Sequence, residues 1–305
     1  MAPRTPAASL DAPPAPSPGR PGGFRPELTP RGCDMARRRG TLAGMTVPTA
    51  TLGSGRRLPL LGLGTWQLRG RQAYGAVRDA LDVGYRHFDT ATVYGNEGEV
   101  GRAIRDSGVP REDVFVTTKL PYDRADRPRG TLNASLDALG LDAVDLWLIH
   151  WPPHRDASLD VWGALLAARK DGLARAVGVS NYSTRQIDEL IEASGESPEV
   201  NQIRWGPSLY DPGRGTELQG RGIVLEGYSP FRSSDLNDRT LRTVASAHAV
   251  TVAQVIVRWH LQHGFAVIPK SARRDRIESN FDVFGFTLGD DEMRSIDCLG
   301  RLEAR

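Results

Sequence analysis

The fold is decided by residues 145–151, which read Asp145-Leu146-Trp147-Leu148-Ile149-His150-Trp151. Four large apolar residues follow one another here, without the alternation of a strand that has one face in water. Such a run is typical of a strand in a parallel sheet that is covered on both faces. Parallel strands need crossover connections, most often helices, and the flanking sequence alternates in this way.

Seven further short apolar segments have the character of strands, and amphipathic segments lie between them. The predicted strands are residues 60–64, 85–91, 114–119, 145–151, 176–181, 200–203, 223–229 and 266–270. The predicted helices include residues 74–82, 97–106, 132–139, 159–170 and 185–193, and the glycines that would end them are Gly84, Gly108, Gly140, Gly172 and Gly195. Eight alternating strands predict an α/β fold, a (β/α)8 TIM barrel. A doubly wound open sheet is the rival, because alternation alone does not demand that the sheet close.

Residues 46–305 form the predicted barrel domain, which opens with a short β-hairpin. Residues 51–59 place Gly53-Ser54-Gly55 between two short segments, which is a turn pattern. Residues 1–45 differ, since nine of them are proline and seven are arginine. Such a segment has few apolar side chains to bury, so we expect a disordered extension without a secretory leader. The alternative is that translation starts at Met45.

The placement of charge and cysteine indicates which classes of partner to expect. The chain carries 39 basic and 37 acidic residues, but residues 46–305 hold 32 basic and 34 acidic ones. Because this domain is slightly acidic, we expect no nucleic-acid partner. No apolar run reaches the ~18 residues of a membrane span, so we expect no membrane partner. Cys33 and Cys298 suit a reducing compartment, and we expect a cytoplasmic protein and a monomer.

Several common catalytic motifs are absent from the sequence. Gly62-Leu63-Gly64 lacks the third glycine of a dinucleotide-binding turn, and no P-loop occurs. No cysteine pair or His-Glu-x-x-His motif has metal-site spacing, so we expect no metal, and no Gly-x-Ser-x-Gly marks a nucleophile. A metal-dependent barrel hydrolase ranks last, since only His150 and Asp89 among the strand-end residues would serve it.

Four polar residues lie at or just after the carboxyl ends of three successive predicted strands: Asp89, Tyr94, Lys119 and His150. In a barrel, these strand ends form the mouth of the active site. One such residue alone is most often a surface ion pair or a hydrogen-bonded core residue, but four together indicate a site. Lys119 is also one of only three lysines among the 39 basic residues.

The four side chains suit protonation of an alkoxide while a hydride arrives from elsewhere. Tyrosine has a pKa of about 10, and a nearby ammonium would lower the pKa of Tyr94 and improve it as a proton donor. Asp89 would keep Lys119 charged and oriented, because a buried charge needs a partner. A neutral His150 would bind a carbonyl oxygen and direct it toward the tyrosine.

The motifs around these residues resemble the aldo-keto reductase family. The likeness is carried by Asp89-Thr90-Ala91, Val93-Tyr94-Gly95-Asn96-Glu97, Thr118-Lys119, Leu148-Ile149-His150-Trp151-Pro152, Gly178-Val179-Ser180-Asn181-Tyr182, Val200-Asn201-Gln202, Gly227-Tyr228-Ser229-Pro230 and Ile268-Pro269-Lys270-Ser271. The resemblance implies a barrel that reduces aldehyde and ketone carbonyls with NADPH and forms NADP+. It also implies a catalytic tetrad of Asp89, Tyr94, Lys119 and His150. The bacterial group that includes 2,5-diketo-gluconate reductases is the most similar in these motifs.

The resemblance further implies which residues bind the nicotinamide end of the cofactor. Ser180, Asn181 and Gln202 would hold the carboxamide, which needs both donors and acceptors. Tyr228 would stack on the ring, although by itself it is equally a packed core residue. The remaining expected contacts are Thr65, Ser229, Pro230 and Phe231.

At the adenosine end, the resemblance places the 2′-phosphate on Lys270, Ser271 and Arg276, which favours NADPH over NADH. Asn280 would lie near the adenine, but Ser279 stands before it where the family often has Glu, so one adenine contact is lost. Arg273 and Arg274 are expected to be ordinary surface charges.

On the substrate side, Trp66, Tyr122 and Trp151 follow three of the predicted strands and predict an aromatic rim. Trp66 and Trp151 are the expected substrate contacts. The chain ends at Arg305, soon after a predicted helix at 290–299, whereas many relatives carry a longer loop over the substrate. We therefore expect an open and less selective pocket for a small-molecule carbonyl substrate.

Two functions follow from these observations. The first is an NADP-dependent oxidoreductase with Tyr94 as the proton donor. The alternative is an NADPH-binding regulatory or redox-sensing subunit with a reductase-like barrel, against which the intact tetrad argues.

Overall fold

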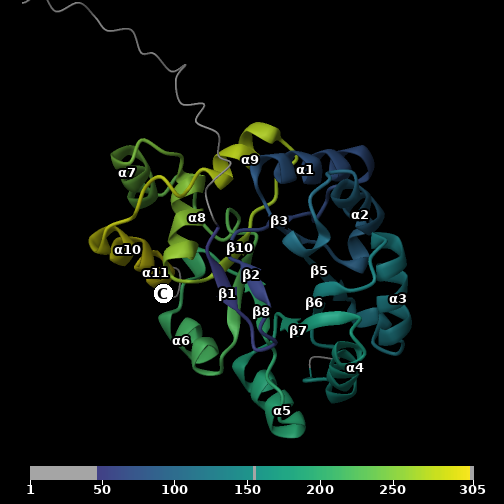
Figure 1. Ribbon diagram of the computed structural model, residues 1–305. Coiled ribbons are helices and arrows are strands. Elements are labelled where there is room, and N and C mark those ends of the chain that lie inside the picture. The colour runs from purple at the N-terminus through teal and green to yellow at the C-terminus, as the bar shows by residue number, and fades with distance from the viewer. Residues whose placement is uncertain (1–46, 154–155, 303–305) are drawn as a thin grey trace, which may run out of the picture. The chain divides into compact units, whose positions relative to one another are not determined.

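Eight parallel strands form a closed ring in the computed structural model, which describes residues 47–153 and 156–302 (Figure 1). The strands are β3 (Leu63–Gly64), β4 (His87–Asp89), β5 (Phe115–Leu120), β6 (Val144–Ile149), β7 (Ala174–Ser180), β8 (Val200–Arg204), β9 (Val224–Tyr228) and β10 (Ala266–Ile268). The ring closes where the segment before β3 meets β10: Leu61 bridges Val267, whose amide donates to the Leu60 carbonyl at 2.8 Å. The predicted (β/α)8 barrel is therefore confirmed, and the open doubly wound sheet is wrong.

Helices follow the strands in turn and surround the ring in Figure 1. The eight that complete the βα units are α1 (Gly70–Val83), α2 (Glu97–Arg105), α3 (Pro128–Leu139), α4 (Leu159–Lys170), α5 (Thr184–Ser194), α6 (Pro212–Gly220), α8 (Val252–Gln262) and α9 (Arg274–Phe281). The additional helices are α7 (Arg239–Ala247), which precedes α8, and α10 (Asp290–Asp297) and α11 (Leu299–Leu302), which follow α9. Short 3₁₀ turns are η1 (Thr92–Tyr94), η2 (Arg111–Asp113), η3 (Tyr122–Arg124) and η5 (Pro207–Leu209).

A two-stranded antiparallel hairpin, β1 (Thr49–Thr51) and β2 (Arg57–Pro59), precedes the barrel. It confirms the hairpin predicted at 51–59, although its first strand begins two residues earlier. The Leu58 side chain is fully buried, and the Pro59 carbonyl lies 3.1 Å from Nδ1 of His87, at the start of β4. The hairpin therefore covers the amino-terminal end of the barrel, where it crosses the middle of the ring in Figure 1. The expected extension of residues 1–45 and the alternative start at Met45 lie outside the described residues.

Local sequence signals account for the helix ends. Gly84 and Gly140 follow α1 and α3 with φ angles of 122° and 64°, which residues with a β-carbon rarely adopt. Ser183 and Gln186 form a capping box at the start of α5. Strand β4 is shorter than the predicted residues 85–91, because its ladder with β5 pairs only residues 87–89.

The barrel wall is apolar and closely packed. All six residues of β6 are buried, as the continuous apolar run predicted. Helices α2 and α3 approach so closely that a β-carbon on Gly101 would lie 1.9 Å from the carbonyl oxygen of Leu139. No single helix in the described ranges is long and apolar enough to cross a membrane, and α7 and α8 meet that test only as a pair bent by 90°.

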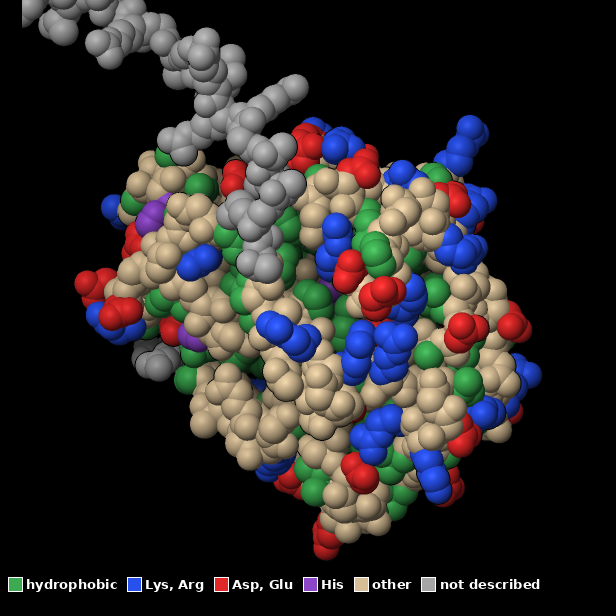
Figure 2. Space-filling view, viewed as in Figure 1, with side chains coloured by type: hydrophobic (Ala, Val, Ile, Leu, Met, Phe, Trp, Pro, Cys, Tyr) green, Lys and Arg blue, Asp and Glu red, His purple; other side chains and the backbone are tan. Residues whose placement is uncertain are grey.

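The amino-terminal end of the barrel carries a group of arginines. The buried carboxylate of Asp145, near the start of β6, pairs with Arg56 from the hairpin, with Arg111 at 2.7 Å and with Arg175 at 3.0 Å. Figure 2 shows a face on which Lys and Arg side chains gather near the middle. Because one carboxylate serves three guanidinium groups, the cluster ties β6, β7 and the hairpin together.

Candidate active site

A cavity of about 650 Å³ opens at the carboxyl ends of the strands, where a (β/α)8 barrel carries its active site. Its wall comes from the ends of seven strands, β5 excepted, and from the segments that follow them. The sequence-predicted site residues that line it are Trp66, Asp89, Tyr94, His150, Trp151, Ser180, Asn181, Gln202, Tyr228, Ser229, Pro230, Phe231 and Lys270.

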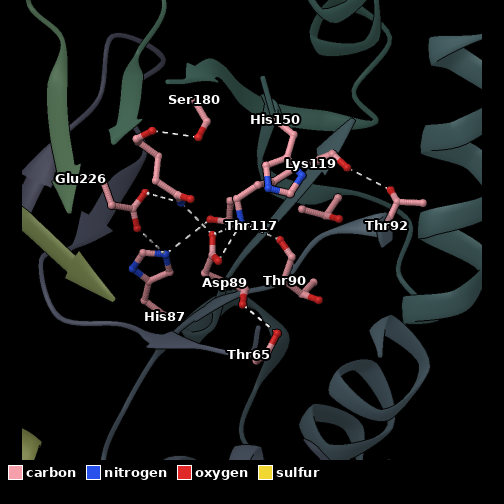
Figure 3. A network of polar contacts seen from close by, with 12 residues as sticks. Thr65, His87, Asp89, Thr90, Thr92, Thr117, Lys119, His150, Ser180 and Glu226 are labelled. Carbon is pink, nitrogen blue, oxygen red and sulfur yellow. Dashed lines mark hydrogen bonds and ion pairs between the residues drawn. The ribbon is translucent and has the colours of Figure 1, made fainter. Parts of the chain in front are cut away.

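A buried ion pair lies at the floor of this cavity. Lys119, which is fully buried on β5, donates to both carboxylate oxygens of Asp89 on β4, at 2.7 and 2.6 Å. Its third hydrogen bond goes to the Thr90 carbonyl at 2.8 Å. The side chain of Gln202 also donates to Asp89, at 2.8 Å, so both charges of the pair are hydrogen-bonded (Figure 3). Asp89 and Lys119 lie at the carboxyl ends of the neighbouring strands β4 and β5, which is why these two residues, 30 apart in sequence, meet.

Tyr94 and His150 lie above this pair. The Lys119 nitrogen is 5.1 Å from the centre of the Tyr94 ring. The Tyr94 and His150 rings meet edge to face, with centroids 5.8 Å apart. Tyr94 ends the 3₁₀ turn η1 and His150 directly follows β6, so both side chains reach the cavity. The four predicted residues are therefore brought together at one point.

The pKa values at this site follow from burial and from the Lys119 charge. Burial, aided by Lys119, lowers the pKa of His150 to about 3, so its ring is neutral at neutral pH. Burial would lower the pKa of Lys119, but Asp89 and Tyr94 outweigh it and raise that pKa. For Tyr94, burial raises the pKa, and Lys119 opposes this without cancelling it. The expectation that Lys119 gives Tyr94 a net lowered pKa is therefore wrong, because burial dominates.

A row of polar side chains continues along the cavity wall at the ends of β7, β8 and β9. Ser180 donates to the Gln202 carbonyl at 2.8 Å, and Asn181 donates to the Ser180 hydroxyl at 2.9 Å. The Tyr228 hydroxyl donates to Oδ1 of Asn181 at 2.9 Å. Asn181 and Ser229 hold φ angles of 64° and 53°, a left-handed backbone that costs free energy and is concentrated at functional sites.

Several predicted residues lie outside the wall of this cavity. Thr65 is fully buried and donates to the Asp89 carbonyl at 2.9 Å, so it supports the site from behind. Tyr122, expected in the aromatic rim, is exposed on η3 and does not line the cavity. Of the residues predicted for the adenosine end, Lys270 lines the cavity, whereas Ser271, Arg276 and Asn280 lie outside its wall.

The four cations of residues 270–276 differ in their ion-pair partners. Arg273 pairs with Asp275 at 2.5 Å, and Arg274 pairs with Asp79 at 2.9 Å and with Glu278. Within the ranges that the structure describes, Lys270 and Arg276 form no ion pair. The charge of Lys270 therefore remains available to an anion and that of Arg276 is only partly balanced by the nearby Asp275, whereas the charges of Arg273 and Arg274 are already engaged in ion pairs.

Sequence reasoning missed some residues of the site. The cavity wall also contains Gln67, Val93, Arg204 and Arg232. A signal existed for Arg204, because it lies two residues after Gln202 on β8 and so shares its face. The residue with the clearest chemistry that was missed is Glu226 on β9, which is fully buried beneath the tetrad. The described residues contain no group of three or more His, Cys, Asp or Glu that could hold a metal ion.

The geometry can be compared with known proteins. A sequence model of the aldo/keto reductase family matches residues 60–301. The chain belongs to the aldo/keto reductase family. Family and fold together make the protein a carbonyl-reducing oxidoreductase of small molecules, and the family resemblance of the motifs is confirmed. The likeness to the 2,5-diketo-gluconate reductase group stays a prediction.

Related proteins match nearly the whole barrel of this aldo/keto reductase. An aldo-keto reductase of Mycobacterium sp. (strain MCS) is 45% identical over 271 residues, which cover 87% of this chain and 94% of that protein. One from Mycobacterium tuberculosis (strain ATCC 25618 / H37Rv) is 44% identical over 268 residues, which cover 86% and 94%.

Solved structures agree with the fold. An aldo/keto reductase from Brucella melitensis matches with a TM-score of 0.81 and 43% identity, covering 84% of this chain and 98% of that one. A Bombyx mori aldo-keto reductase in complex with NADP matches with a TM-score of 0.78 and 34% identity, covering 84% and 93%.

Proposed function

We propose that this aldo/keto reductase reduces aldehydes and ketones to alcohols with NADPH, and that Tyr94 donates the proton. The observation that carries the proposal is the buried Lys119–Asp89 pair beneath Tyr94 and a neutral His150. A hydroxyl group over an ammonium is suited to giving up a proton, because the positive charge stabilises the phenolate that remains.

The residues of the cavity fit the proposed cofactor. NADPH carries a carboxamide at one end and phosphates along its length. The polar row of Ser180, Asn181 and Gln202 offers the carboxamide both donors and acceptors. Three cations line the cavity, Arg204, Arg232 and Lys270, and none of them forms an ion pair within the described part of the chain. Such a wall favours an anionic ligand. The Bombyx mori relative binds NADP, in agreement with this fit.

When bound, NADPH would supply a hydride to the carbonyl carbon. The chain's own residues perform the remaining tasks. Neutral His150 hydrogen-bonds the carbonyl oxygen and holds it near Tyr94, whose hydroxyl proton moves to that oxygen as the alkoxide forms. Lys119 stabilises the phenolate left on Tyr94, and Asp89 keeps Lys119 charged and fixed. The phenolate then regains a proton from solvent, so one hydride and one proton convert the carbonyl to an alcohol.

At the adenosine end, we assign the 2′-phosphate to Lys270, with Ser271 and Arg276 beside it and Asn280 at the adenine. Support comes from the two cations of this set, which form no ion pair among the described residues. On the substrate side, Trp66 and Trp151 are 43% and 48% exposed at the cavity mouth. Because these two exposed aromatic side chains lie in the wall of one cavity, and apolar surface gathered at a groove marks a binding site, we assign the organic part of the substrate to them.

Oxidation of NADPH by the purified protein, followed by absorbance across a panel of sugar, aliphatic and aromatic carbonyls, tests the proposal. Tyr94→Phe should reduce turnover by on the order of 10²–10⁴ while the NADPH affinity stays within about twofold. Tyr122→Phe is the matched control, because this exposed tyrosine does not line the cavity. An undiminished rate in Tyr94→Phe would reject its role. NADPH binding without turnover on any carbonyl would favour the regulatory subunit instead.

A further inference from the structure

A second carboxyl group is buried inside the barrel beneath the tetrad. Glu226, on β9, has no exposed surface, and its side chain points toward Asp89 and His87 in Figure 3. The Gln202 amide donates to Oε2 of Glu226 at 3.3 Å and to Asp89 at 2.8 Å, so one side chain bridges the two carboxyl groups. The other oxygen, Oε1, has no hydrogen-bond partner in the described part of the chain.

The neighbour of that oxygen is the ring of His87, which is also fully buried. Nδ1 of His87 lies 3.1 Å from the Pro59 carbonyl, and a carbonyl only accepts, so Nδ1 carries a hydrogen. In a neutral ring Nε2 is then an acceptor. Nε2 faces Oε1 of Glu226 at 3.5 Å, and the Thr117 hydroxyl lies 3.4 Å away. Two acceptors would face each other here unless a proton lies between Glu226 and His87.

A count of the buried charges also indicates that the Glu226–His87 pair holds one proton. A protonated Glu226 beside a neutral His87 carries no net charge, and neither does an ionised Glu226 beside a protonated His87. The Asp89–Lys119 pair is neutral as well, so one proton on the Glu226–His87 pair keeps the interior neutral. If that proton leaves, the interior holds two carboxylates against one ammonium. A low dielectric makes such an imbalance costly.

The other groups around the pair do not alter this count. On the strands next to β9, β8 contributes the uncharged Gln202 and, at its exposed end, Arg204, whose charge is in contact with solvent, and β10 is apolar. The ionisable groups that act on the pair from other elements are Asp89 on β4, Lys119 on β5 and Asp145 on β6. His260 on α8 lies against Gly227, and burial lowers its pKa to about 4, so it is neutral.

The ionisation of the pair is set mainly by burial. Burial and the nearby Asp89 charge raise the pKa of Glu226 to about 8. Burial lowers the pKa of His87 to about 4. Between these values the proton therefore resides on Glu226, which donates toward Nε2 of His87, and it leaves only in alkaline solution.

We propose that Glu226, held by His87 and Gln202, is a positioning residue that controls how strongly Lys119 acts on Tyr94. While Glu226 keeps its proton, Lys119 is balanced by Asp89 alone. Once Glu226 ionises, its charge also acts on Lys119 and cancels more of the positive field beneath Tyr94. Tyr94 then becomes a weaker acid, and carbonyl reduction slows. This inference rests on the proposed reductase function.

Glu226→Gln tests the proposal, because the amide has the shape of the protonated acid. It cannot ionise, and its N–H group can still donate a hydrogen bond to His87. The matched control is Glu199→Gln, which removes another buried carboxyl at the opposite end of the barrel, where Glu199 accepts from the Ser54 amide at 2.7 Å. Carbonyl reduction at saturating NADPH is measured for each protein across the pH range around 8.

The expected result is a split by pH. Near pH 7 Glu226→Gln should turn over within about twofold of the wild type. Above pH 8 the turnover of the wild type should be about three- to tenfold lower than that of Glu226→Gln. This factor corresponds to a rise of up to about one in the pKa of the proton donor. Glu199→Gln should keep the wild-type inflection. If Glu226→Gln also keeps it, the positioning role is refuted.

A second measurement does not depend on turnover. The infrared carbonyl band of a protonated carboxylic acid should be present in the wild type at neutral pH and disappear through a midpoint near 8. Burial also raises the pKa of Glu97, so any contribution of Glu97 to this band is identified by comparison with Glu97→Gln and subtracted. If no such band remains at neutral pH, the proposal is overturned, even if Glu226→Gln fails to fold. If no variant shows turnover but the band titrates as expected, the reductase function fails while the protonated pair stands.

Discussion

Replacing Lys119 by Met leaves the Asp89 carboxylate buried without its cation. The substitution removes three hydrogen bonds of 2.6–2.8 Å, two to Asp89 and one to the Thr90 carbonyl. Asp89 is only 2% exposed, and its carboxylate would keep one side-chain hydrogen bond, which the uncharged Gln202 amide donates. Breaking a buried pair in this way costs roughly 3–5 kcal/mol of the free energy of unfolding. Turnover should fall by about 10²–10⁴, because Tyr94 loses the charge that stabilises its phenolate.

The stability loss is measured by urea unfolding, followed by tryptophan fluorescence. The matched variant is Asp89→Asn combined with Lys119→Met, in which neither partner is charged. This double variant should recover at least about 2 kcal/mol relative to Lys119→Met, since no uncompensated charge remains. Turnover should not recover, because the ammonium beneath Tyr94 is still missing.

Two results would refute this reasoning. One is a Lys119→Met protein that unfolds within about 1 kcal/mol of the wild type at neutral pH, which would mean that the pair is solvated. The other is a double variant less stable than the single one, which would mean that Asp89 gains its stability from Gln202 and the barrel wall, and that the ammonium adds little.

Three further predictions concern cofactor choice, packing and acid stability. Lys270→Ala should weaken NADPH binding by about 10–100-fold but NADH binding by no more than about twofold, while Arg273→Ala leaves both unchanged; equal losses would reject the phosphate assignment. Gly101→Ala should lower the free energy of unfolding by roughly 2–3 kcal/mol, since its β-carbon would lie 1.9 Å from a carbonyl oxygen. In the same urea assay, Gly163→Ala in α4, where space is open, should raise it by about 0.5–1 kcal/mol. Burial lowers the pKa of His87 from 6.5 to about 4, so below pH 6.5 the unfolded chain binds its proton first, and stability should fall by up to roughly 3 kcal/mol as the pH drops to 4. The free energy of unfolding of His87→Gln, measured at each pH by equilibrium unfolding, should lack this part of the fall between pH 6.5 and 4.

The architecture could be predicted because its signals are local. The continuous apolar run in β6 indicates burial on both faces, and glycines such as Gly84 mark where helices stop. Closure of the ring could not be predicted in the same way. It depends on hydrogen bonds between residues 60–62 and Val267, which are about 200 positions apart, and no local pattern reports such a contact.

The site could be predicted where a strand-end position and a chemical type coincide. Asp89 and Lys119 meet because the carboxyl ends of parallel strands lie side by side. The net pKa of Tyr94 was predicted in the wrong direction, because the sequence reports its charged neighbour but not the depth of its burial. Glu226 was missed although a signal existed, since it lies two residues before Tyr228 on β9 and a strand repeats its faces every second residue. The same rule connects His87 to Asp89.

The choice of lysine at position 119 follows from counting donors. The ammonium group has three hydrogens, and the structure provides three acceptors: two oxygens of Asp89 and the Thr90 carbonyl. A guanidinium would bring five donors to this fully buried position, and the two left over would have to displace a neighbour or remain unpaired, at a cost of about 1–3 kcal/mol each. The chain uses arginine for 36 of its 39 basic residues, so its retention of lysine here fits a site that has room for three hydrogen bonds and a compact charge. At this position the interior, rather than solvent, dictates the side chain, whereas the other two lysines, Lys170 and Lys270, are exposed.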